Sequence, residues 1–161
     1  MEETFDPEWP GIGGAYDFVE ASYDWVLQRA AALDARLTSL LAYSGVLAFA
    51  APVVARALTE APDYDSTLFN AGLALFVGIA VGVVLVRLVG GVRVPTQDIL
   101  TSQRWLNQPD DAFRRDMVDL GGRDLRHNLS VMRWRGLLTD MLGLLFAAQV
   151  VVLSVWVSQT F

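Results

Sequence analysis

The sequence predicts an all-α integral membrane protein with three transmembrane helices and a helical cytoplasmic layer. Three long apolar runs carry this prediction, at 37–57, 68–89 and 137–158. Each run has roughly 20 residues, the length that crosses about 30 Å of hydrocarbon as a helix. Each run also lacks the polar face that a soluble core helix of this length keeps. The composition agrees, since 53% of the 161 residues are hydrophobic and the mean hydropathy is +0.38.

The residues before the first apolar run divide into a tail and a helix. Residues 1–14 are acidic and rich in proline and glycine, which indicates a flexible tail. Residues 15–36 are predicted to form a cytoplasmic amphipathic helix, because apolar residues recur there at spacings of three and four. This helix could pack on another cytoplasmic helix or lie on the membrane surface. Its polar face lacks the basic residues that anionic lipid attracts, which favours packing. The apolar stripe consists of Val19, Tyr23, Val26, Ala30 and Leu33.

The segment 90–136 is predicted to be a cytoplasmic segment of helices separated by breaks. A first helix is expected over 97–106. The aspartate pair at 110–111 can cap a second helix, and Gly121-Gly122 is expected to end it. A third helix is expected to run from Arg123 directly into the third apolar run.

The arginines set the expected orientation. The 58–67 connection holds no basic residue, whereas 90–136 holds eight arginines. By the positive-inside rule, 58–67 is an external loop of the plasma membrane and 90–136 is cytoplasmic. The N-terminus is then cytoplasmic and the C-terminus external. Asn128-Leu129-Ser130 fits the N-glycosylation pattern, but this orientation keeps it inside and unmodified.

The charged residues are unusual in kind as well as in number. All 12 basic residues are arginine, and 18 acidic residues give a formal net charge of −6. This balance argues against a nucleic-acid partner. An acidic, lysine-free composition is typical of a salt-adapted archaeal halophile, in which high salt screens the self-repulsion. A GC-rich genome would also explain the missing lysine, although it explains the acid excess less well.

Few residues could support enzymatic chemistry. The chain has no cysteine and one histidine, which excludes thiolate chemistry and a histidine-rich metal site within one copy. His127 shares a helix face with Asp124 and Ser130, but side chains on one helix project in parallel rather than converge. We therefore expect a protein that is not an enzyme and that binds neither a metal nor a cofactor.

Polar residues within the apolar runs are the first candidate site, because their burial in lipid is costly. Arg87 and Asp140 lie at similar depth near the inner interface, so we expect an ion pair between them. Such a pair would act as a structural staple or as part of a gate or relay. Gln149 lies near mid-membrane, and Ser44 and Asn70 are further intramembrane polar groups. Gln149 is expected to hydrogen-bond to another helix, within one chain or across an oligomer axis, or to line a pore.

Small residues recur every four positions and predict close helix packing. They are Ala74, Gly78 and Gly82 in the second run and Gly143 and Ala147 in the third. Three spans leave these stripes and Gln149 in need of partners, which favours a homo-oligomer. A Gly78→Ile substitution is expected to weaken its assembly.

The cytoplasmic arginines form a second candidate site. Arg114 with Arg115, or Arg123 with Arg126, could bind an anionic ligand such as a nucleotide through bidentate phosphate contacts. Six aspartates are interleaved with them, so a salt-bridged cytoplasmic face is the alternative.

Two stretches resemble a known group of proteins. One is Leu33-Asp34-Ala35-Arg36-Leu37 through Gly45, and the other is Arg126-His127-Asn128 through Arg133-Trp134-Arg135. Their layout is similar to SLATT-type domains and to the transmembrane effectors of cyclic-pyrimidine (Pycsar) anti-phage systems, in which a cytoplasmic helix enters a small-residue-rich span through an Asp-x-Lys motif. Arg36 stands here in place of the lysine. The resemblance implies an oligomeric effector that perturbs the membrane when a nucleotide signal or partner arrives.

Two classes of function therefore remain open. One is a signal-gated or partner-gated membrane effector or pore of the anti-phage defence type. The other is a non-enzymatic structural or scaffolding subunit that recruits cytoplasmic partners.

Overall fold

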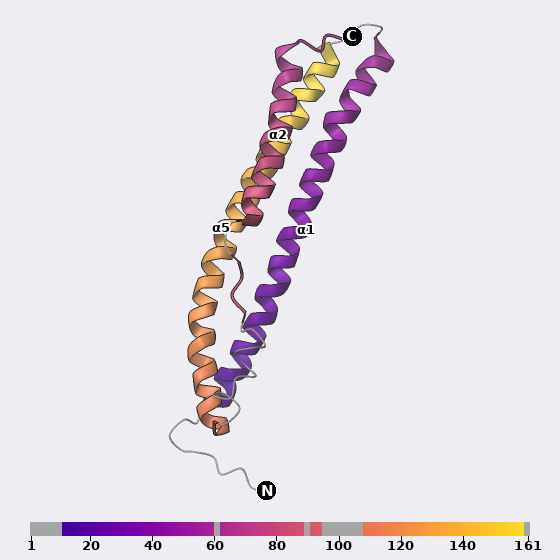
Figure 1. Ribbon diagram of the computed structural model, residues 1–161. Coiled ribbons are helices and arrows are strands. Elements are labelled where there is room, and N and C mark those ends of the chain that lie inside the picture. Colours follow the sequence, from indigo (N-terminus) through magenta and orange to yellow (C-terminus); the bar gives the residue numbers. More distant parts are fainter. Residues whose placement is uncertain (1–10, 60–61, 89–90, 95–107, 160–161) are drawn as a thin grey trace. The chain divides into compact units, whose positions relative to one another are not determined.

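The computed structural model describes residues 11–59, 62–88, 91–94 and 108–159 (Figure 1). Within these ranges the chain forms three α-helices and no strand. Helix α1 covers Ile12–Leu58, α2 covers Thr67–Leu88 and α5 covers Asp110–Gln159. The predicted all-α class with three long apolar helices is confirmed at this level. The helix predicted over 97–106 lies outside the described residues, as do positions 1–10 of the predicted tail.

Helix α1 contains both the predicted amphipathic helix, 15–36, and the first apolar run, 37–57, in one continuous helix. It begins at Ile12, so the last residues of the predicted tail are helical, and it continues without interruption across the boundary at 36 and 37. With 47 residues it is about 70 Å long at 1.5 Å per residue. Only part of that length is apolar enough to cross a bilayer.

Helix α5 corrects the prediction that Gly121-Gly122 ends a helix. Asp110 and Asp111 occupy its first turn, where negative charge is favourable, and the helix then runs through both glycines to Gln159. Gly121 is buried against Val19 of α1, and an added Cβ would overlap that valine. The glycine therefore allows a close helix contact. The packing of α5 against α1 outweighs a helix propensity about 1 kcal/mol lower than that of alanine.

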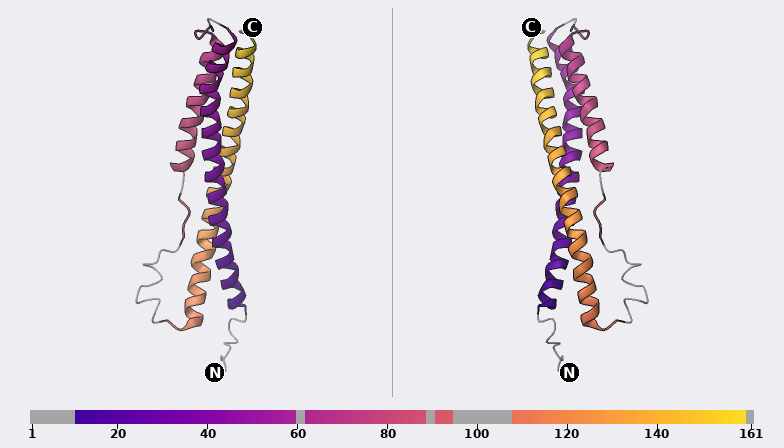
Figure 2. Two further views of the ribbon diagram at one scale, coloured as in Figure 1. Left: turned by 90° about the vertical axis from the view of Figure 1, so that its right-hand side faces the viewer. Right: turned by 90° about the vertical axis from the view of Figure 1, so that its left-hand side faces the viewer.

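The chain divides into two compact units. We call Met1–Ala30 with Gly91–Arg133 the polar unit, and Ala31–Gly90 with Trp134–Phe161 the apolar unit. In the apolar unit, α2 lies alongside the C-terminal parts of α1 and α5 (Figure 2). In the polar unit, α1 contacts α5 through Val19 and through a hydrogen bond from Tyr23 to Asp124.

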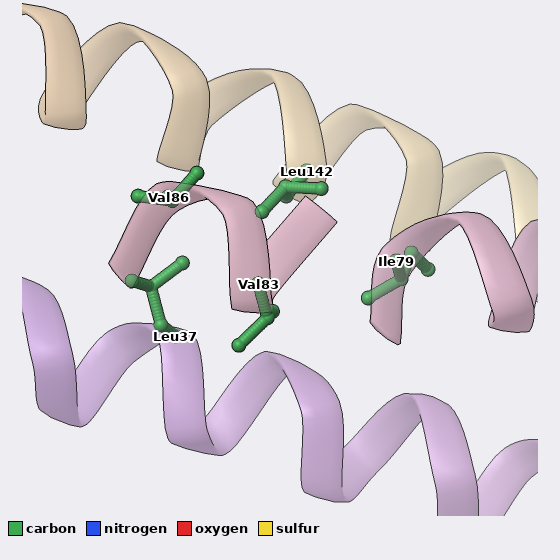
Figure 3. Packing of buried hydrophobic residues seen from close by; sticks show 5 residues of the cluster. All are labelled: Leu37, Ile79, Val83, Val86 and Leu142. Carbon is green, nitrogen blue, oxygen red and sulfur yellow. The ribbon is translucent and has the colours of Figure 1, made fainter. Parts of the chain in front are cut away.

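The core of the apolar unit is built from all three helices. Figure 3 shows one cluster in which side chains of each helix meet, and a second cluster lies further along the same helices. Two glycines of α2 let it approach α5, because an added Cβ would overlap Leu153 at Gly72 and Leu142 at Gly82. The first cluster consists of Leu37, Ile79, Val83, Val86 and Leu142, and the second of Ala51, Ala55, Leu153 and Trp156.

The loop between α1 and α2 contacts the C-terminal end of α5 through Trp156. The Trp156 indole donates a hydrogen bond to the Asp63 carbonyl at 3.0 Å. The Phe69 ring lies 4.7 Å from the Trp156 ring, and the Tyr64 ring lies 6.0 Å from it. These aromatic contacts close one end of the apolar unit.

Each of the three helices contains a stretch long and apolar enough to cross a membrane. Only 22% of each stretch is buried inside the chain. Large apolar side chains such as Phe49, Leu88 and Leu144 are about three-quarters exposed. An apolar surface of this extent is normal for helices in contact with lipid and abnormal for a soluble protein.

Candidate functional site: polar contacts between α1 and α5

Ser44 and Gln149 form a fully buried polar pair between α1 and α5. The Ser44 hydroxyl donates to the Gln149 side-chain oxygen at 2.5 Å, and the Gln149 amide donates to the Ser44 carbonyl at 3.2 Å. The pair fixes the glutamine in one orientation, because both ends of its amide are used. Of the three arrangements expected for Gln149, the structure has the contact within one chain.

Arg135 is a charged residue of α5 that is almost completely buried at the contact with α1. Its side chain is 8% exposed, and one of its terminal nitrogens lies 2.5 Å from the Asp34 carboxylate of α1. Its Nε is buried without a hydrogen-bond partner among the described residues. Asp34 is 48% exposed, so it stays partly solvated while it neutralises the arginine. Removing either partner from such a pair costs more than the pair contributes, because a buried charge is left uncompensated.

The expected ion pair between Arg87 and Asp140 is not the pairing in the structure. Asp140 pairs instead with Arg36 of α1 at 2.9 Å, and Arg87 donates to the Thr38 hydroxyl at 2.6 Å. Both charged side chains therefore take their partners from α1 rather than from each other. Similar expected depth in the membrane therefore did not predict the partner of either residue. Depth does not determine the direction in which a side chain leaves its helix.

Buried residues recur every seven positions along α5, and three of them are polar. Positions 121, 128, 135, 142, 149 and 156 are all buried, and they are occupied by Gly, Asn, Arg, Leu, Gln and Trp. A heptad spacing is typical of helices that pack side by side at a small crossing angle, and polar residues at such positions fix the register of the contact. Asn128, Arg135 and Thr139 are buried groups that the predictions from the sequence did not include. The seven-residue spacing from Asn128 to Arg135, continued at Leu142 and Gln149, is the signal that would have identified the first two. Thr139 lies off this spacing, four residues after Arg135.

Asn128 holds the chain after α2 against α5 within the polar unit. Its side chain accepts from the Arg93 backbone N–H at 2.8 Å and donates to the Arg93 carbonyl at 2.9 Å. Asn128 is fully buried, so its glycosylation pattern has no accessible amide to modify. A buried asparagine that pairs with both backbone groups of one residue gives a specific attachment point.

Tyr23 and Asp124 link α1 to α5 in the polar unit. The tyrosine hydroxyl donates to the carboxylate at 3.0 Å. Partial burial, together with the hydrogen bond and the charge of Asp124, raises the pKa of Tyr23 to about 12. Asp124 thus faces Tyr23 rather than forming a triad with His127 and Ser130.

The four arginines of the predicted anion site have different surroundings. Arg114 pairs with Asp110 at 2.9 Å, and its guanidinium lies 5.9 Å from the centre of the Tyr16 ring. Arg123 donates to the Asp119 carbonyl of its own helix at 3.3 Å. Arg115 and Arg126 are exposed.

The remaining predicted site residues lie mainly on the outer surface. Asn70 is exposed and donates to the Asp65 carbonyl at 3.5 Å, at the start of α2. Ala74 and Gly78 are exposed, and an added Cβ at Gly78 would meet nothing within 4 Å. Of the two glycines in that stripe, Gly82 contacts α5 through Leu142 and Gly78 does not. On α5, Ala147 is exposed and Gly143 lies near the Arg36 guanidinium.

Together these contacts make α1 and α5 a helix pair whose register is fixed by polar groups. In the apolar unit Asp34 contacts Arg135 and Ser44 contacts Gln149, so α1 and α5 are parallel there. In the polar unit the Val19–Gly121 and Tyr23–Asp124 contacts give the same direction. No protein-family model matches this chain, and neither a curated protein nor a solved structure is similar to it.

Proposed function

We propose that this protein is a three-span, homo-oligomeric membrane effector of the anti-phage defence type, gated by a signal or partner that acts on its polar unit. The polar unit lies in the cytoplasm and the 58–67 loop lies outside the plasma membrane. The ligand is a cytoplasmic protein or a nucleotide, with the exposed arginines of α5 as the candidate anion contact.

One observation carries the proposal. Helices α1 and α5 each run without a break from a charged segment into a stretch apolar enough to cross a membrane. No flexible linker separates the two segments of either helix. A movement of the charged segment of one helix relative to the other would therefore also move the apolar stretches. Ser44–Gln149 and Asp34–Arg135 are the contacts that such a displacement would break or exchange.

The scaffolding alternative is favoured by a different observation. The polar unit exposes both apolar and charged side chains, including Phe18, Trp25 and Arg126, as a protein-binding surface would. A scaffold would recruit partners through this surface without any change in membrane permeability.

A reversible clamp in the polar unit separates the two functions without knowledge of the ligand. Val19→Cys with Gly121→Cys would place two cysteines at a close α1–α5 contact of the polar unit, and the chain has no other cysteine. In liposomes loaded with a fluorescent dye, an effector should release dye at different rates in the oxidised and the reduced state. Equal dye retention in both states, together with retained binding of cytoplasmic partners, would support the scaffold.

Orientation is tested separately by cysteine labelling in whole cells. Cysteines at Asp65 and Gln159 are expected to react with an impermeant reagent, and one at Gln108 is not. Labelling at Gln108 alone would reverse the proposed topology.

A further inference from the structure

An apolar groove runs along the polar unit between α1 and α5. It encloses about 400 Å³ and is lined by Phe18, Ala21, Ser22, Trp25, Leu125 and Leu129. The three largest exposed side chains in this lining are Phe18, Trp25 and Leu129, which are 64%, 46% and 44% exposed. The groove lies in the charged part of both helices, where lipid tails would not cover it. Large apolar side chains exposed in such a place mark a protein contact.

We propose that a second copy of this chain covers the groove, with the two grooves facing each other across a two-fold axis. In this arrangement α1 of one copy packs against α5 of the other, and each contact occurs twice. This inference deepens the homo-oligomer of the proposed function by naming its surface. It rests on that proposal in one respect, namely that both copies have the same orientation in one membrane.

The two sides of the groove have complementary shapes. The contacts of Val19 with Gly121 and of Tyr23 with Asp124 show which residues of α1 and α5 are level with each other. Gly122 is therefore level with the interval between the protruding Phe18 and Trp25. An added Cβ at Gly122 would meet nothing within 4 Å, so there is open space above it. Copies with the same orientation bring the two aromatic rings of one copy to either side of Gly122 of the other.

The charges on the outer flanks of the groove are complementary as well. Helical spacing places the exposed Asp17 and Asp24 on the flank of α1 and the exposed Arg126 on the flank of α5. Asp24 and Arg126 are nearly level, so the two-fold arrangement brings each aspartate toward the arginine of the other copy. Asp119 is the exposed acid on the α5 flank and lies about two turns from Arg126.

Disulfide formation between two differently tagged chains tests this surface. One chain carries Ala21→Cys and the other carries Gly122→Cys, so a mixed disulfide can form only between copies because the protein has no native cysteine. Leu27→Cys is the matched control, since Leu27 is 45% exposed on α1 but lies on the face away from the groove. In native membranes we expect the 21–122 pair to yield about tenfold more mixed disulfide than the 27–122 pair. Equal yields from the two pairs would overturn the proposal.

A second pair of measurements keeps the test independent of the cysteines. Trp25→Gln should lower the fraction of two-chain particles in lipid nanodiscs and raise the dissociation constant about tenfold or more, as for a buried aromatic anchor. Asp24→Arg or Arg126→Asp alone should also weaken the dimer, and the two together should restore it. An unchanged dimer in Trp25→Gln, or single charge reversals whose effects simply add, would contradict the proposal.

The outcome separates this surface from the proposed function. A dimer through the groove without any effect of the Val19–Gly121 clamp on dye release would retain the surface and reject the gated effector. Clamp-dependent release from particles that contain one chain would retain the effector and reject the surface.

Discussion

The two helix contacts of the apolar unit differ in the chemistry that holds them. Helix α5 contacts α1 through Ser44–Gln149, Asp34–Arg135 and Arg36–Asp140, whereas α2 is held mainly by apolar side chains and by glycines. Apolar packing tolerates a shift along the helix, while directional hydrogen bonds and ion pairs specify one register. The difference suggests that α2 provides close packing and that the α1–α5 contact sets the alignment of the two long helices.

The largest expected effect comes from the glycine contact of α2. Gly82→Leu should destabilise the folded chain by about 2–3 kcal/mol, because the new side chain would overlap Leu142 and force α2 away from α5. Thermal unfolding in detergent, followed by circular dichroism, measures this loss. Gly78→Leu is the matched control on the same helix, since its surroundings are open. Equal destabilisation by both variants would show that α2 does not pack on α5 through Gly82.

The polar α1–α5 contact should respond to substitution differently. Gln149→Leu should cost about 1–2 kcal/mol, because it leaves the buried Ser44 hydroxyl without its acceptor. Adding Ser44→Ala should recover part of that loss, because the second polar group is then removed as well. The same unfolding measurement on the two single variants and the double variant gives the coupling. Purely additive losses would contradict a direct contact between the two side chains.

The exposed ion pair should contribute less than the buried groups. Arg36 and Asp140 are more than half exposed, so their coupling in a double-mutant cycle should be about 0–1 kcal/mol. The same cycle on Arg87 and Asp140 should show no coupling, because the two residues have other partners. A larger coupling for Arg87 and Asp140 would restore the pairing that the sequence suggested.

The smallest expected effect concerns pH and the polar unit. The pKa of Tyr23 is raised to about 12 in the folded chain, above its ordinary value of 10.0. The stabilising contribution of the neutral phenol is therefore fully present below pH 10 and is lost as the pH rises toward 12. Tyr23→Phe should remove this part of the pH dependence. Between pH 9 and 12 the thermal midpoint of Tyr23→Phe should fall less than that of the unsubstituted protein. An equal fall of the midpoint in both proteins would contradict the contact with Asp124.

The sequence predicted the three apolar helices well because an uninterrupted apolar run of that length has few alternatives. It predicted the breaks poorly, since Gly121-Gly122 reads locally as a helix end and becomes a packing contact only when Val19 is opposite. Depth along the runs suggested Arg87 with Asp140. In the structure Asp140 pairs with Arg36 instead, because its side chain lies on the face of α5 that is next to α1. Arg135 and Asn128 were missed because the charge pattern of 90–136 masks the heptad spacing that buries them.

The measurement that tests the account most directly is an intrachain disulfide between Val19→Cys and Gly121→Cys. An added Cβ at Gly121 would lie 3.3 Å from the Val19 Cβ, close to the separation that a disulfide requires. If α1 and α5 are parallel and aligned as described, mild oxidation should link the two peptides within a single chain, as detected by mass spectrometry after digestion. Val19→Cys with Leu125→Cys, about one helical turn further along α5, should stay reduced. Linkage in the second pair and not in the first would show a different register and would contradict the alignment of α1 and α5 in the polar unit.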